Sequence, residues 1–103
     1  MIKHIVGWEF AEEAEGADKA TNVALASEAL RRLPELIDGI LEFEVVVPQP
    51  GLESSFDLAL YSVFTDAAAL RAYAVHPEHQ KVVAIIGARR SGRTCLDYDT
   101  DAL

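Results

Sequence analysis

The side chains best suited to chemistry in this chain gather in one run, from Tyr73 through His76 and Pro77 to His79. Proline favours the first position of a helix, because the N–H that it lacks is unpaired there in any case. His79 would then lie in the first turn, where unpaired N–H groups carry a partial positive charge that disfavours an imidazolium. We therefore expect a neutral His79, the form in which histidine removes a proton next to a carbonyl.

Two further polar side chains are candidates for the same site. Tyr73 lies beyond the break at Pro77, and its hydroxyl could donate a hydrogen bond to a developing enolate oxygen. His4 belongs to a stretch that alternates as a strand does, on the same side as the apolar residues. A structural role is the alternative for all three, with His79 bracing the helix start and the other two packed in the core.

The sequence offers few residues for holding a metal or a cofactor. No carboxylate at ligand spacing is directed clearly toward the three histidines. The run 97–101 resembles the start of a calcium loop, but Ala102 replaces the glycine of the sixth position. The lone Cys95 has no CxxC partner, and we interpret it as a small buried strand residue. We expect neither a metal nor a cofactor.

The length, net charge and apolar runs of the chain indicate which kinds of partner to expect. The chain has 103 residues, enough for one domain spanning 1–103, and a net charge of −8. The electric field of this negative charge repels a phosphate backbone, so we expect no nucleic acid as a partner.

No apolar run reaches the roughly 20 residues that span a bilayer, and no signal peptide pattern is present, so we expect a cytoplasmic protein without membrane contact. Arg89, Arg90 and Arg93 form the basic cluster, which we interpret as a loop that balances the acidic surface, with an anionic ligand as the alternative.

The periodicity of apolar residues predicts the elements that must position these side chains. Strands are predicted at 2–10, 40–47, 56–64 and 93–98, and helices from 18 to about 32, from 67 to 74 and from 77 to 86. Asp18 or Thr21 can cap the first helix, and Thr65 or Asp66 the second. Pro34 should end the first regular helix near Arg32 and open a short extra turn.

The order of these elements is β-α-β-β-α-β, which predicts an α+β fold of the ferredoxin-like type. Such a fold has a four-stranded antiparallel sheet with helices on one face only. The other face would expose Ile5, Tyr61, Val63 and either Phe43 with Val45 or the strand neighbours of these two. An exposed apolar patch of that size is typical of an interface. We therefore expect a homodimer in which two open sheet faces form a closed α+β barrel.

The chain resembles the stress-responsive A/B barrel (Dabb) family of the dimeric α+β barrel superfamily over nearly its whole length. The resemblance rests on the segments 1–6, 56–60 with Phe64, 70–80 and 96–99. The joint spacing of His4, the Tyr-x-x-His-Pro-x-His run and the terminal Asp-Tyr makes it specific. It implies a dimeric α+β barrel, in agreement with the order of elements.

The functions that this resemblance implies are mixed. One catalytic branch is similar to a plant polyketide cyclase, which performs an intramolecular aldol reaction with residues that correspond to His4, Tyr73 and His79. We expect the ligand site to be lined by His76 and four apolar residues: Val6, Val23, Leu30 and Leu60. The first hypothesis is a homodimer that binds a small apolar ligand without catalysis, and the second is a cofactor-independent enzyme of the cyclase type. A cofactor-free monooxygenase or isomerase is the third.

Overall fold

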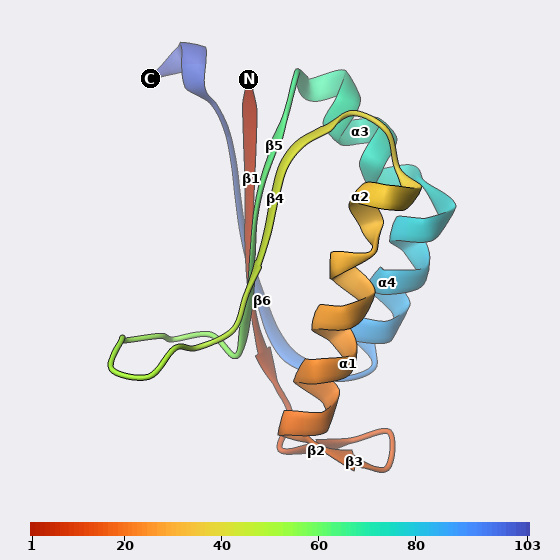
Figure 1. Ribbon diagram of the computed structural model, residues 1–103, viewed down its shortest axis with the longest axis vertical. Coiled ribbons are helices and arrows are strands. Elements are labelled where there is room, and N and C mark those ends of the chain that lie inside the picture. Colours follow the sequence, from red (N-terminus) through yellow and green to blue (C-terminus); the bar gives the residue numbers. More distant parts are fainter.

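The computed structural model describes residues 1–103, and it contains a four-stranded antiparallel sheet with the four α-helices on one side (Figure 1). The strands are β1 (Ile2–Phe10), β4 (Ile40–Val46), β5 (Leu58–Phe64) and β6 (Arg90–Asp99). The helices are α1 (Lys19–Arg31), α2 (Leu33–Leu36), α3 (Ala67–Val75) and α4 (Pro77–Gly87). The strand order is β4-β5-β1-β6, so the first and last strands are neighbours. The predicted ferredoxin-like α+β fold is confirmed.

Three polar side chains cap the long helices. Asp18 accepts a hydrogen bond from the backbone N–H of Thr21 at 2.8 Å, and Asp66 accepts one from Ala69 at 2.8 Å. His76 caps α4 through its Nδ1, which accepts from the N–H of Glu78 at 3.1 Å, and Pro77 is the first residue of that helix. The cap at His76 fixes the break between α3 and α4, and so it fixes how Tyr73 and His79 lie relative to each other in space.

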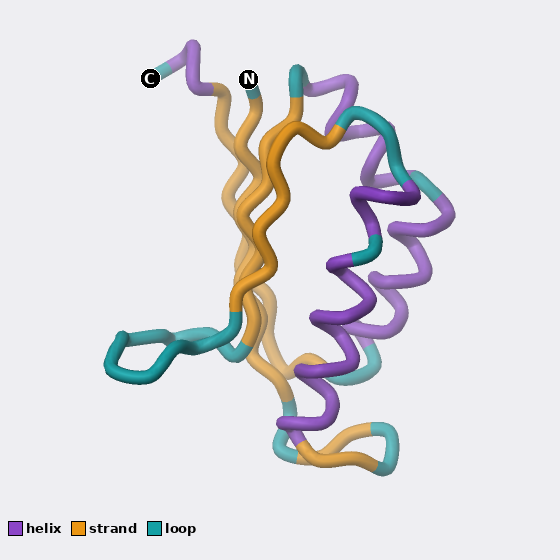
Figure 2. The backbone as a smooth tube through the Cα atoms, in the orientation of Figure 1, coloured by secondary structure: helices purple, strands orange, loops and turns teal.

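The core lies between the sheet and the helix layer (Figure 2). The even-numbered residues of β1 point toward the helices, as the alternation predicts, because Val6, Trp8 and Phe10 are buried. Phe64 and Tyr73 are the largest fully buried side chains, with ring centroids 5.0 Å apart. Pro34 lies in α2 and α1 ends at Arg31, as predicted.

The structure corrects several predicted boundaries. The stretch 11–17 is not a simple loop, because β2 (Glu13–Ala14) pairs with β3 (Ala17–Asp18) across a turn with positive φ at Glu15 and Gly16. β6 begins at Arg90, three residues before the predicted start, so Arg90 belongs to a strand. A short 3-10 helix (Thr100–Ala102) follows β6.

Two side chains lie in surroundings other than those predicted. Cys95 faces the helix side, opposite Val6, yet it is exposed, because β6 is an edge strand. Phe56 precedes β5, and its ring lies over Gly7 on the uncovered face rather than on the helix side.

The uncovered face of the sheet, called the open face below, is of mixed polarity. Phe43 and Val45 pack toward the helices, so their strand neighbours Glu42 and Glu44 occupy the open face, opposite Val63 and Tyr61. The open face also carries Ile5 and Lys3 from β1 and an exposed Leu96 from β6, whereas Val63 is buried. The loop between β4 and β5 projects from the same side of the sheet (Figures 1 and 2).

Candidate functional site

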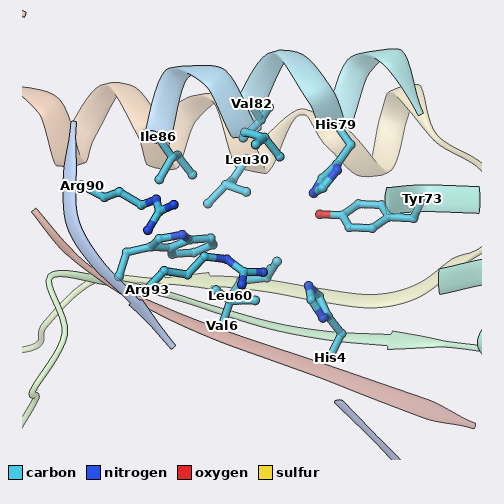
Figure 3. Close-up of a pocket in the computed structure, with 12 residues that line it drawn as sticks. His4, Val6, Leu30, Leu60, Tyr73, His79, Val82, Ile86, Arg90 and Arg93 are labelled. Carbon is cyan, nitrogen blue, oxygen red and sulfur yellow. The ribbon is translucent and has the colours of Figure 1, made fainter. Parts of the chain in front are cut away.

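A cavity of about 280 Å³ lies between the sheet and the helices. Its middle is apolar, with Val6, Trp8 and Leu60 from the strands and Leu30, Val82 and Ile86 from the helices. His4, Tyr73 and His79 stand at one end of the cavity and Arg90 at the other, and the side chain of Arg93 extends from the Arg90 end toward the middle (Figure 3). The three side chains proposed for chemistry therefore line one cavity, which opens to solvent beside the exposed Arg90 and Arg93.

His79 is oriented by the break between α3 and α4. Its Nδ1 lies 3.0 Å from the carbonyl oxygen of Ala74. A carbonyl oxygen only accepts, so Nδ1 carries the proton and Nε2 of the neutral ring keeps a free lone pair. Burial lowers the pKa of His79 below its ordinary value, and the positive charge of Arg93 acts in the same direction. At neutral pH the ring is therefore an uncharged base with one free nitrogen.

Tyr73 brings a hydroxyl to the cavity that nothing in the protein satisfies. Its side chain is only 1% exposed, and its hydroxyl has no hydrogen-bond partner. The ring centroid lies 4.3 Å from that of His79 and 6.2 Å from that of His4. Burial raises the pKa of Tyr73 far above its ordinary value. The residue therefore remains a phenol, and its hydroxyl can donate to an acceptor in the cavity (Figure 3).

His4 is held by a residue of the neighbouring strand. Its Nδ1 donates to Oδ1 of Asp97 at 2.5 Å, and its backbone carbonyl accepts from the hydroxyl of Ser62 at 2.9 Å. Asp97 was not predicted as a site residue, although it lies in the predicted strand 93–98, because the sequence does not show which residue it faces. Pairing of the first and last strands is the signal that would have found it, since Asp97 stands directly opposite His4.

One group of residues in the chain is able to hold a metal ion. His4, Cys95 and Asp97 bring one ligand atom each to within 4.8 Å of one another. Nitrogen, sulfur and oxygen donors of this kind suit Zn²⁺. The three histidines do not form such a group, and Nδ1 of His76 caps α4.

The residues expected to line the ligand site divide into two sets. Val6, Leu30 and Leu60 line the cavity. Val23 packs against the core but does not reach the cavity, and His76 stands outside it at the start of α4. Three further residues line the cavity that were not predicted to do so: Trp8 on the helix-facing side of β1, and the buried Val82 and Ile86 of α4.

The comparisons identify the family. The sequence profile described as Stress responsive A/B Barrel Domain (Dabb) matches residues 2–100. The chain belongs to the Dabb family. A dimeric protein of unknown function from Bacteroides fragilis is 31% identical to this Dabb chain, with a TM-score of 0.81 and coverage of 95% of this chain and 94% of the other.

Two further solved structures share the fold of this Dabb chain. A dimeric ferredoxin-like protein of unknown function from a Jannaschia species is 28% identical, with a TM-score of 0.73 and coverage of 96% and 98%. A hydroxynitrile lyase from Passiflora edulis is 15% identical, with a TM-score of 0.76 and coverage of 94% and 90%. A search of curated proteins finds no match to the Dabb chain. None of its helices has the length and apolar character needed to cross a bilayer.

Proposed function

We propose that each protomer binds a small, largely apolar ligand that offers an oxygen acceptor to Tyr73. The observation that carries this proposal is the buried hydroxyl of Tyr73, which has no partner within the protein. A buried donor without a partner costs about 1–3 kcal/mol, so its persistence beside a cavity favours a role toward a ligand. A carbonyl oxygen placed there would accept this hydrogen bond while the carbon chain contacts Val6, Leu30 and Leu60.

We further propose that the site moves a proton at the carbon next to that carbonyl. Nε2 of His79 takes the proton, the C–H electron pair forms the enolate, and the hydroxyl of Tyr73 stabilises the enolate oxygen. The enolate carbon then attacks a second carbonyl, as in an intramolecular aldol reaction, and the oxygen of that carbonyl takes the proton back from His79; without a second carbonyl, the enolate carbon regains the proton. Asp97 keeps the ring of His4 directed along the cavity as a further polar partner. This chemistry uses side chains alone.

The experiment uses Trp8, the single tryptophan, which lines the cavity. Phenylacetone, an apolar ketone, should change the fluorescence of Trp8 on binding, and His79→Asn should bind it equally well. Exchange of its benzylic protons in deuterated water, followed by NMR, should be accelerated by the wild type and not by His79→Asn. Asparagine keeps a donor near the position of Nδ1 but lacks the base. Binding without accelerated exchange would leave a ligand-binding protein and reject the enzyme.

We also propose a homodimer formed through the open face. Support comes from the apolar Ile5, Tyr61 and Leu96 on that face and from the dimeric state of the relatives from Bacteroides fragilis and Jannaschia. Light scattering should give twice the mass of one chain. Leu96→Asp should produce monomers, because it places an unpaired charge in the interface. Leu25→Asp, on the helix layer, is the matched control, and a wild type that stays monomeric would end the proposal.

A further inference from the structure

The cavity has a second polar end, formed by β6. Arg93 stands opposite Trp8 in the β1–β6 register, and Arg90 stands opposite Phe10. Because Trp8 and Phe10 point into the core, the two arginines share the helix side of the sheet. The guanidinium group of Arg90 stands at the end of the cavity opposite Tyr73 and His79, and that of Arg93 extends from this end toward the middle of the cavity (Figure 3).

Neither of these two arginines has an acidic partner. No salt bridge of the chain includes Arg90 or Arg93, although 17 of the 103 residues are acidic. Arg89, next to them in the sequence, is held differently, because it donates to Asn22 at 3.0 Å and to the carbonyl of Ile85 at 2.9 Å. Arg89 is therefore held within the fold, whereas Arg90 and Arg93 are exposed cations without an acidic partner, and both line the same cavity.

We infer that Arg90 and Arg93 form a carboxylate subsite, and that the ligand is a small keto acid with its carboxylate at this end. The guanidinium fork matches the geometry of a carboxylate and forms charge-assisted hydrogen bonds with it. The apolar middle of the cavity, with Leu30 and Val82, would hold the carbon skeleton between the two polar ends. The position of the ketone rests on the function proposed above, whereas the carboxylate subsite rests on the arginines alone.

The experiment compares two ligands of nearly equal shape, 4-acetylbenzoate and 4-acetylbenzamide. Both carry the ketone and the ring, and only the first carries a negative charge. Titrations followed by the fluorescence of Trp8 should show at least tenfold tighter binding of the carboxylate, which is the size of effect expected for a hydrogen bond to a charged group. Arg90→Gln and Arg93→Gln should each weaken the carboxylate about tenfold and leave the amide unchanged.

Arg71→Gln is the matched control, because Arg71 is an exposed arginine of α3 that does not line the cavity. It removes the same charge and should change neither affinity. Added salt should weaken the carboxylate and not the amide, which supplies a second readout that does not depend on a variant. Equal wild-type affinities for the two ligands, or equal losses in Arg71→Gln and Arg93→Gln, would overturn the subsite.

Tyr73→Phe separates this inference from the function on which it rests. It should weaken the carboxylate and the amide by the same factor, because both present the same ketone. If it changes neither affinity while the arginine variants still discriminate, the ketone position is wrong and the subsite stands. If neither ligand binds, the proposed binding function and the subsite both fail.

Discussion

The proposed ligand binding depends most on the hydroxyl of Tyr73. Its ring fills the core between Phe64 and His79, and only the hydroxyl is without a partner. The residue type and its place before His79 were evident from the sequence, which also placed His4 on the correct side of its strand. The missing partner was not evident, because it depends on every polar atom that the fold brings near. Asp97 escaped prediction for the same reason, since its partner His4 lies at the other end of the chain.

Replacing Tyr73 by phenylalanine should therefore stabilise the protein while it weakens ligand binding. The change removes a buried hydroxyl without a partner, and we expect the free energy of unfolding to rise by about 1 kcal/mol. Urea unfolding at a fixed protein concentration measures this. Tyr98→Phe, at a half-buried position on β6, is the matched control and should change little. A clear loss of stability in Tyr73→Phe would show that the hydroxyl is satisfied in solution.

The lowered pKa of His79 predicts a dependence of stability on pH. The ordinary value is 6.5, burial lowers it in the folded state, and His4, His76 and Arg93 act in the same direction. Below 6.5 the unfolded chain then binds more protons than the folded one at this residue, so stability falls as the pH falls. Between about pH 7.5 and 5.5, the free energy of unfolding should decrease more in the wild type than in His79→Asn. Equal decreases would contradict the lowered pKa.

At the scale of elements, the regular helices and strands follow from local patterns. Caps at Asp18 and Asp66 and prolines at 34 and 77 mark the helix limits, and alternation marks β1. The short β2–β3 hairpin escaped prediction because it has almost no apolar pattern of its own. The start of β6 at Arg90 was not predicted, because Arg90 pairs with Phe10 across a bulge, and the partner strand determines such a pairing.

The packing of Phe56 on β1 gives a prediction at this scale. A Cβ atom added at Gly7 would lie 2.7 Å from the Phe56 ring, so Gly7→Ala must displace that ring. We expect a loss of about 1–3 kcal/mol in the free energy of unfolding, as for other overpacked sites. Gly87→Ala is the matched control, because nothing lies within 4 Å of its added Cβ. It should be neutral or slightly stabilising, and an equal loss in both variants would contradict the steric explanation.

At the scale of the whole molecule, the net charge of −8 opposes the proposed homodimer. Two like-charged protomers repel each other, and salt screens that repulsion. The dissociation constant of the dimer, measured by analytical ultracentrifugation, should therefore decrease when salt is raised from about 0.02 M to about 0.2 M. An increase would show that ion pairs between protomers dominate the interface instead.

Strand β1 separates the two surfaces on which the proposals depend, with only one backbone between them. His4, Val6 and Trp8 face the cavity, while Lys3, Ile5 and Gly7 face the open side of the sheet. Dimer formation and ligand binding would then be coupled, because both involve the backbone of β1. If the dimer binds a ligand more tightly than a single protomer does, thermodynamic reciprocity requires the ligand to tighten the dimer by the same factor. The oligomeric state would then report on occupancy of a cavity that lies on the other face of the sheet.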